Sequence, residues 1–87
     1  IRALDSVPLG SSVSTDFRLA PYLATTREVT FGISKNHPSP EYMIFSDITY
    51  SPLFEKGILK VIRETFPDHT YKEIAKFGEY HVYKRIQ

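Results

Sequence analysis

Three short segments of the chain carry the hydrophobic pattern of strands. Val13–Thr15 is brief and rich in β-branched residues, and Glu28–Ile33 alternates so that its apolar side chains lie on one side. Glu41–Asp47 contains four apolar residues in a row, as expected for a central strand that is covered on both faces. We therefore predict three inner strands.

Two other segments have helical spacing. Asp16 is placed to cap a short helix of about two turns, with Pro21 in its first turns. A longer amphipathic helix is predicted from about 52 to 66, with Ser51 as a hydroxyl cap and Pro52 at its first position. Gly57 lies inside it and should cost about 1 kcal/mol relative to alanine.

The C-terminal segment predicts a hairpin. Thr70–Phe77 and Tyr80–Ile86 flank Gly78-Glu79, which suits a type II′ turn. Four basic residues are expected to protect an exposed edge of the sheet from pairing with other chains; they are Lys72, Lys76, Lys84 and Arg85.

These elements predict an α/β fold. A strand, a helix and a strand in close succession imply a right-handed parallel crossover. We expect a small Rossmann-like layered domain with two helices and a mixed sheet. Its three parallel strands should have the order 2-1-3, with the antiparallel hairpin beyond strand three.

Length and composition narrow the class of protein. The 87 residues, 41% of them hydrophobic, suit one soluble domain over residues 1–87, with 1–10 as a connector. The chain has no cysteine, which excludes disulfides and thiolate metal sites, and its net charge of +1 gives no reason to expect nucleic acid. No apolar run approaches the roughly 20 residues of a membrane span. Because the chain opens with Ile1, we expect a piece of a longer protein.

Polar residues follow the first and third predicted strands. Asp16 and Asp47 end them, with Ser14, Thr15 and Ser46 beside the two carboxylates. If the strands are neighbours, these side chains share one crevice, where paired carboxylates can bind a metal or divide acid and base roles. The alternative is that one aspartate caps a helix and the other closes a turn. We treat the five as a candidate ligand-binding site and assign no catalytic residue.

Other candidate chemistry is sparse. Arg18 joins the candidate site as a side chain that can hold an anion, and the alternative is a solvated residue. The histidines, His37, His69 and His81, are far apart in sequence and lack metal-ligand spacing, so no metal is assigned. A nucleophile elbow, a phosphate loop and a dinucleotide motif are all missing, and no cofactor is predicted.

The hairpin carries tyrosines that allow two interpretations. Tyr71, Tyr80 and Tyr83 could form an outward patch that docks on another surface, because tyrosine favours interfaces. They could equally cover a thin sheet. Both alternatives stay open on sequence alone.

The order of several short motifs resembles a known family. They are Val7-Pro8-Leu9-Gly10-Ser11-Ser12-Val13-Ser14-Thr15, Leu19-Ala20-Pro21-Tyr22-Leu23-Ala24, Arg27-Glu28-Val29, Glu41-Tyr42-Met43-Ile44-Phe45-Ser46-Asp47 and Gly78-Glu79-Tyr80-His81-Val82-Tyr83-Lys84-Arg85. The series is similar to the soluble C-terminal domain of a family of predicted polytopic membrane proteins of unknown function. That family is distantly similar to membrane glycosyltransferases that use lipid-linked sugars.

The resemblance implies a function for the domain. We expect a non-catalytic, water-exposed accessory or recognition domain of a glycosyltransferase-like membrane protein, on the extracytoplasmic side. Its partner would be the transmembrane portion of its own parent chain, and the parent, not this domain, would be the enzyme. The alternative is a module that binds a sugar or other small ligand in the predicted crevice. An independent hydrolase or transferase is the least favoured hypothesis.

Overall fold

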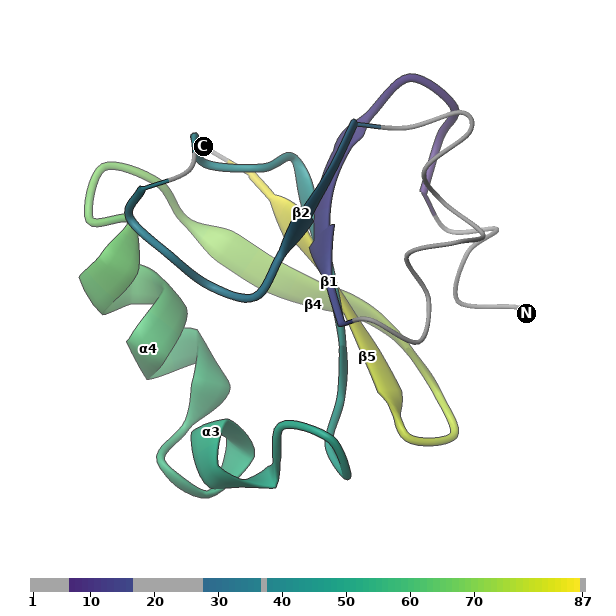
Figure 1. Cartoon of the computed structure of the whole chain (residues 1–87), viewed down its shortest axis with the longest axis vertical. Coiled ribbons are helices and arrows are strands. Elements are labelled where there is room, and N and C mark those ends of the chain that lie inside the picture. Colours follow the sequence, from purple (N-terminus) through teal and green to yellow (C-terminus); the bar gives the residue numbers. More distant parts are fainter. Residues whose placement is uncertain (1–6, 17–27, 37, 87) are drawn as a thin grey trace.

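Five strands form one mixed sheet in a computed structural model of the chain, which describes residues 7–16, 28–36 and 38–86 (Figure 1). The strands are β1 (Ser12–Thr15), β2 (Glu28–Phe31), β3 (Tyr42–Ser46), β4 (Tyr71–Phe77) and β5 (Tyr80–Arg85). Their order across the sheet is β2-β1-β3-β5-β4. The predicted mixed sheet with an α/β architecture is confirmed.

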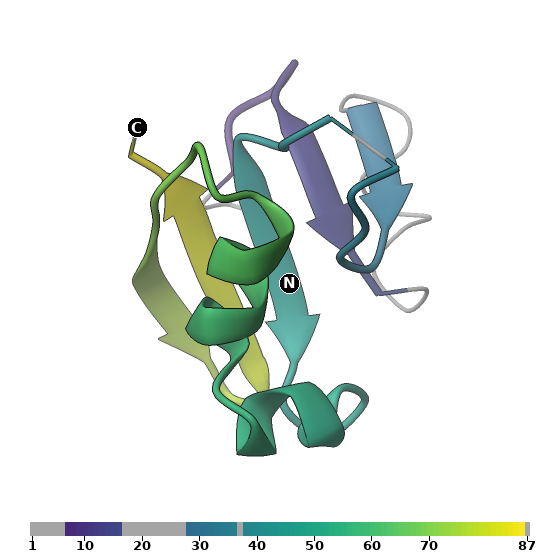
Figure 2. The ribbon, with the colours of Figure 1, turned by 90° about the vertical axis from the view of Figure 1, so that its left-hand side faces the viewer.

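The two halves of the sheet run in different directions. β1 pairs in parallel with β2 on one side and with β3 on the other. β5 is antiparallel to both β3 and β4, so the hairpin extends the sheet beyond β3 (Figure 2). Of the basic hairpin residues, Lys72 and Lys76 lie on the edge strand β4, whereas Lys84 and Arg85 lie on the inner strand β5.

β3 is the centre of the molecule because all five of its residues are buried. Successive side chains in a strand point to opposite faces. Met43 and Phe45 accordingly pack with the helices, whereas Tyr42 and Ile44 pack with Val13 and other residues on the opposite face. The run of apolar residues that predicted a doubly covered strand therefore fills two hydrophobic clusters.

Two helices, α3 (Ser51–Glu55) and α4 (Ile58–Thr65), follow β3. α4 lies against one face of the sheet, and α3 lies near the carboxyl end of β3 (Figure 2). α4 buries Ile58 and Ile62 against the strands. In the part of the chain that the structure describes, no helix is long and apolar enough to cross a membrane.

The continuous helix predicted from 52 to 66 is wrong, because the chain breaks between α3 and α4. Gly57 has φ = 86° and ψ = 93°, a backbone conformation outside any helix, and it precedes the first residue of α4. The predicted hydroxyl cap is also displaced by one residue. Tyr50 occupies the cap position of α3 without a side-chain cap bond, and Ser51 is already helical. The spacing of apolar residues alone does not distinguish one continuous helix from two consecutive helices.

A Gly57→Ala variant tests this break by the sign of its effect. In a continuous helix the alanine would stabilise the protein by about 1 kcal/mol. At a positive φ the same alanine is strained, so we expect the free energy of unfolding to fall by about 1–2 kcal/mol. A Cβ at this position would meet only Lys60 Cβ, at an ordinary 3.9 Å, so the cost comes from the backbone and not from a clash.

Lys56 provides the matched control in urea unfolding. It is adjacent, exposed and has the helical angles φ = −80° and ψ = −8°. Lys56→Ala should therefore change stability by less than about 0.5 kcal/mol. A stabilising Gly57→Ala would show that the helix is continuous.

The hairpin turn has the predicted length and geometry. Phe77 pairs with Tyr80, which leaves a two-residue loop of Gly78 and Glu79. Gly78 has φ = 61°, and no described residue other than glycine has a positive φ. A positive φ at the first loop position alone is the signature of a type II′ turn.

A β-bulge at Ile74 changes the register of the hairpin. Ala75 lies opposite Val82, but Glu73 lies opposite Tyr83, so Ile74 has no partner on β5. One extra residue moves the side chains that precede it to the other face of the sheet. Tyr71 therefore packs with the helices, while Ala75 packs with the cluster on the opposite face.

Two predictions fall outside the described residues. The short helix after Asp16 and most of the connector over 1–10 involve residues 17–27 and 1–6. Residue 7 is described, and Val7 is buried in the cluster that contains Val13.

Candidate functional site

The polar side chains predicted at the carboxyl ends of β1 and β3, called the rim below, are positioned by the register of the parallel strands. Thr15 pairs with Ile44, two residues before Ser46, so Thr15 and Ser46 lie toward the same end of neighbouring strands and on the same face. Ser14 pairs with Met43 and therefore faces the opposite side. All three side chains are buried.

The rim hydroxyls are largely committed to internal hydrogen bonds. Ser14 Oγ and Thr30 Oγ1 are 2.6 Å apart. Ser46 Oγ donates to a carboxylate oxygen of Glu79 in the hairpin turn and accepts from the backbone N–H groups of Ile48 and Thr49 at 3.1 and 3.2 Å. These bonds fix the turn and the loop after β3 to each other. Ser46 therefore acts as a structural anchor.

Asp16 is fully buried beside an aromatic residue of the loop after β3. Burial raises the pKa of the Tyr50 phenol, and the negative charge of Asp16 raises it further. Tyr50 in turn packs edge-on against Phe45, with ring centroids 5.1 Å apart. Arg18, the sixth predicted site residue, lies outside the described residues.

Asp47 belongs to a different group of interacting side chains, which was not predicted from the sequence. Its Oδ2 atom is 2.9 Å from Nε2 of His81. The other ring nitrogen, Nδ1, hydrogen-bonds to Oε1 of Glu73 on β4. His81 thus joins the carboxyl end of β3 to the edge strand through two carboxylates.

Two aromatic side chains flank this histidine. The Phe54 ring of α3 lies 4.6 Å from the imidazole, and the Tyr83 ring is parallel to it at 6.4 Å with an interplanar angle of 7°. Residues two apart on a strand share a face, which places His81 and Tyr83 together beneath the helices. The face of β5 under α3 and α4 is therefore aromatic.

A cavity of about 310 Å³ opens between these rings and the helices. Its lining residues are Phe54, Gly57, Ile58, Leu59, Glu73, His81 and Tyr83. The walls are chiefly apolar, and the polar groups come from the hairpin. Such a combination is typical of small-ligand sites, in which a few placed polar groups orient the bound molecule.

The buried Tyr83 phenol reports the electrostatics of the cavity. Its pKa is raised well above the ordinary value of 10.0, first by burial and then by the negative charges of Glu73 and Asp47. Both carboxylates therefore act on the same atom.

Stability should fall at high pH because of Tyr83. Its phenol ionises near pH 10.0 in the unfolded chain and at higher pH in the folded one. The unfolded state then releases its proton first, so the stability that is present below pH 10 decreases as the pH rises through the folded pKa. Tyr83→Phe should make this decrease shallower between pH 10 and about pH 11, as measured by urea unfolding. Equal decreases in both proteins would contradict the assignment.

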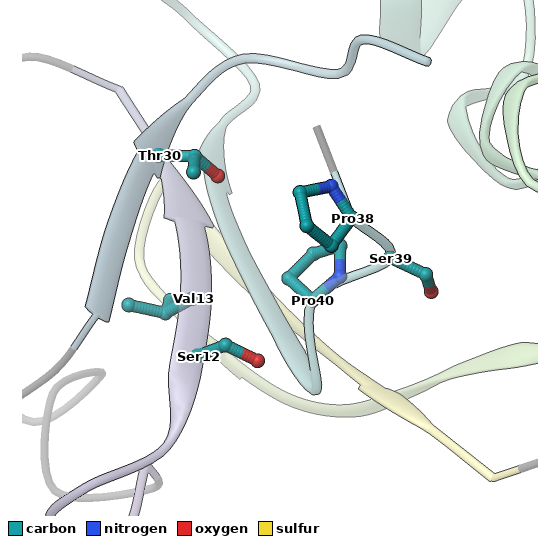
Figure 3. Close-up of a pocket in the computed structure, with 6 residues that line it drawn as sticks. All are labelled: Ser12, Val13, Thr30, Pro38, Ser39 and Pro40. Carbon is teal, nitrogen blue, oxygen red and sulfur yellow. The ribbon is translucent and has the colours of Figure 1, made fainter. Parts of the chain in front are cut away.

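A second cavity, of about 260 Å³, lies at the other end of the parallel strands. Figure 3 shows Pro38 and Pro40, from the loop before β3, beside Ser12 of β1 and Thr30 of β2. The Ser12 hydroxyl accepts from the backbone N–H of Glu41, and Thr30 bonds to Ser14. Among the described residues, no charged side chain lines this cavity, so these residues offer less for specific recognition than those of the cavity under the helices.

The tyrosines considered for docking lie mainly inward. Tyr71 and Tyr83 are only 8% and 2% exposed, and Tyr80 is half-buried against the cluster around Val13. The Tyr71 hydroxyl hydrogen-bonds to Pro40 O and to Ser39 Oγ.

The described residues include no group of three or more histidine, aspartate or glutamate side chains arranged to hold a metal ion. His37 lies outside the described residues.

Comparison with known proteins gives no relative. No family model matches the chain, and no curated protein or solved structure matches it either.

Proposed function

We propose that this chain is a non-catalytic, water-exposed recognition domain of a polytopic, glycosyltransferase-like membrane protein, and that it lies on the extracytoplasmic side. Its partner is the transmembrane portion of its own parent chain. The series of motifs from Val7 to Arg85 supports the membrane parent. The cavity between the hairpin and the helices supports recognition.

One observation carries the non-catalytic part of the proposal. Most of the acid, base and hydroxyl side chains near the rim are bonded to one another: Asp47 and Glu73 to His81, and Ser46 to Glu79. The Thr15 hydroxyl has no hydrogen-bond partner among the described residues, but it is fully buried and therefore out of reach of a substrate. A nucleophile needs a base within reach that is not already engaged elsewhere. The open cavity, by contrast, is lined mainly by rings and aliphatic groups, which bind without reacting.

The layering of the domain is proposed to be Rossmann-like. The parallel pairing of β1 with both β2 and β3 supports this interpretation, because parallel neighbours require crossover connections. In such folds, ligands bind outside the carboxyl ends of the strands. Asp47 lies at that end of β3.

Cysteine labelling of the full-length parent in intact cells tests the location. The domain has no cysteine of its own, so single cysteines can be introduced at Leu9 and Ile48, which are 73% and 69% exposed. In a parent whose other cysteines are replaced by serine, a membrane-impermeant maleimide should label both positions before permeabilisation. Val13→Cys, at a fully buried position, is the control that should label only after denaturation. Labelling of the exposed sites only after permeabilisation would place the domain inside the cell.

A second candidate function is carbohydrate or other small-ligand binding at the rim of β1 and β3. It is favoured by the position of Asp47, which is 34% exposed at that rim and contacts His81 of the cavity. Titration with monosaccharides, followed by amide NMR shifts, should then perturb Thr15, Ser46 and Asp47. Unchanged spectra at high sugar concentration would count against this function and leave the recognition role untouched.

A further inference from the structure

We propose that the cavity under α3 and α4 binds a small organic cation, an ammonium or guanidinium group carried on a short apolar stem. This preference for a cation is a property of the cavity itself and adds a ligand to the recognition role. It does not depend on which larger protein carries the domain.

The net negative charge of the Asp47, Glu73 and His81 side chains favours a cation. Asp47 and Glu73 supply two carboxylates, while His81 supplies at most one positive charge, so the three side chains together have a net charge of −1 or lower. Glu73 lines the cavity and its side chain is 40% exposed. A carboxylate offers about four acceptor sites, and the bond to His81 uses one of them. Glu73 can therefore accept hydrogen bonds from a cation in the cavity.

The rings supply the second argument. Phe54 and Tyr83 both line the cavity, and the faces of such rings attract ammonium and guanidinium groups. Ile58 and Leu59 of α4 add aliphatic wall, and Leu59 is 43% exposed although it is a large apolar residue. An exposed leucine beside a carboxylate suits a ligand that has an apolar stem and a charged end.

Size limits the ligand. At about 310 Å³ the cavity is at the lower end of the range for small-molecule sites, roughly 300–1,000 Å³. One charged group and a short stem fill such a space. A free small molecule of this size needs no further contacts, so we assign the site to one.

A positive side chain of the hairpin, Lys76, opposes the binding of a cation. Lys76 lies opposite His81 in the hairpin register, so the two share a face of the sheet, and Lys76 is exposed. It does not line the cavity. Its charge should weaken the affinity for a cation moderately and strengthen the affinity for an anion. Substitution of Lys76 therefore tests which ligand charge the site prefers.

The first test compares three probes with the same apolar chain: n-hexylammonium, 1-hexanol and hexanoate. Amide NMR shifts of the isotope-labelled domain give the location and the Kd. Hexylammonium should shift Phe54, Leu59 and Tyr83 and bind about tenfold more tightly than hexanol, because one charge-assisted hydrogen bond is worth roughly that factor. Hexanoate should bind most weakly. Equal affinity for hexylammonium and hexanol would show that the site is only an apolar groove. Tighter binding of hexanoate would show that the site prefers an anion. Either result overturns the proposal.

Charge variants form the second test. Glu73→Gln keeps an acceptor for His81 but removes the negative charge, so hexylammonium should bind about tenfold more weakly. Lys76→Gln should tighten binding by roughly two- to threefold, as expected for an exposed charge. Glu64→Gln on α4 changes the net charge as Glu73→Gln does, but its side chain does not line the cavity, and its affinity should equal that of the wild type. Equal losses in the two glutamate variants would overturn the proposal, provided that far-UV circular dichroism shows both folded.

A tripeptide with blocked ends and a single, central lysine between two alanines tests the assignment to a small molecule. It carries the same ammonium group and a similar stem, but also a peptide backbone. We expect weaker binding than for hexylammonium, because ordering the peptide backbone at the mouth of the cavity costs conformational entropy. Tighter binding of the tripeptide at the same residues would contradict the assignment to a free small molecule.

Discussion

A Phe45→Ala variant should lose about 3–5 kcal/mol of its free energy of unfolding. Phe45 lies in the middle strand and is fully buried. Its ring packs in the cluster that joins β3 to α4 and the hairpin, and it contacts Tyr50 edge-on. Truncation removes this apolar contact area and leaves a cavity between the layers. Because domains are typically stable by only about 5–15 kcal/mol, this loss is a large share of the total and should lower the urea midpoint of unfolding clearly.

Urea unfolding of Phe45→Ala and Ile86→Ala provides the comparison. Ile86 is also a large apolar residue but is 56% exposed, so its truncation should cost less than about 1 kcal/mol. If the two variants lose similar stability, β3 is not the centre of the core.

His81→Ala should destabilise the protein by about 2 kcal/mol. The change removes the imidazole that contacts both Asp47 and Glu73 and leaves the two carboxylates without this partner. It also removes the ring contact with Phe54, worth about 0.5–1.5 kcal/mol. Since the carboxylates are 34% and 40% exposed, solvent screening lowers the contribution of each bond, and the estimate includes that discount.

Two further variants show whether the loss comes from the bridge. Lys76→Ala, opposite His81 on β4 and exposed, should change stability by less than about 0.5 kcal/mol. When Asp47 and Glu73 are first replaced by alanine, His81→Ala should cost markedly less than in the wild type, because the bonded partners are already gone. An undiminished cost in that background would mean that the carboxylates do not depend on the histidine.

The strands could be predicted from the sequence because their side chains face well-defined environments. Tyr42–Phe45 is apolar throughout since both faces of β3 are covered. Gly78-Glu79 gives the turn length and with it the pairing of Phe77 with Tyr80. Local rules are sufficient for such features.

The helical region could not be predicted in full because its apolar spacing is compatible with either one helix or two. Phe54, Ile58 and Ile62 keep a helical period across Gly57, yet the glycine adopts a positive φ. Its conformation depends on how the two helices reach the sheet, which is tertiary information. Propensity alone predicted only a small cost there.

The site escaped prediction because of the bulge. If the register set by the turn continued without interruption, Ile74 would lie opposite Tyr83, and Glu73 would fall on the face away from His81. The extra residue instead places Glu73 opposite Tyr83, where it bonds to the histidine. Nothing in the sequence around Ile74, which contains neither glycine nor proline, indicates a bulge. Asp47 was predicted as a rim residue, but its partner on β5 depends on the same hairpin placement.

The position of this bulge is the claim on which the carboxylate–histidine cluster and the cavity both depend. Cross-strand nuclear Overhauser contacts between β4 and β5 test it most directly. The structure predicts backbone contacts between Glu73 and Tyr83 and between Ala75 and Val82, with Ile74 between the two pairs. Contacts between Ile74 and Tyr83, together with Glu73 opposite Lys84, would show an unbroken hairpin and contradict the account.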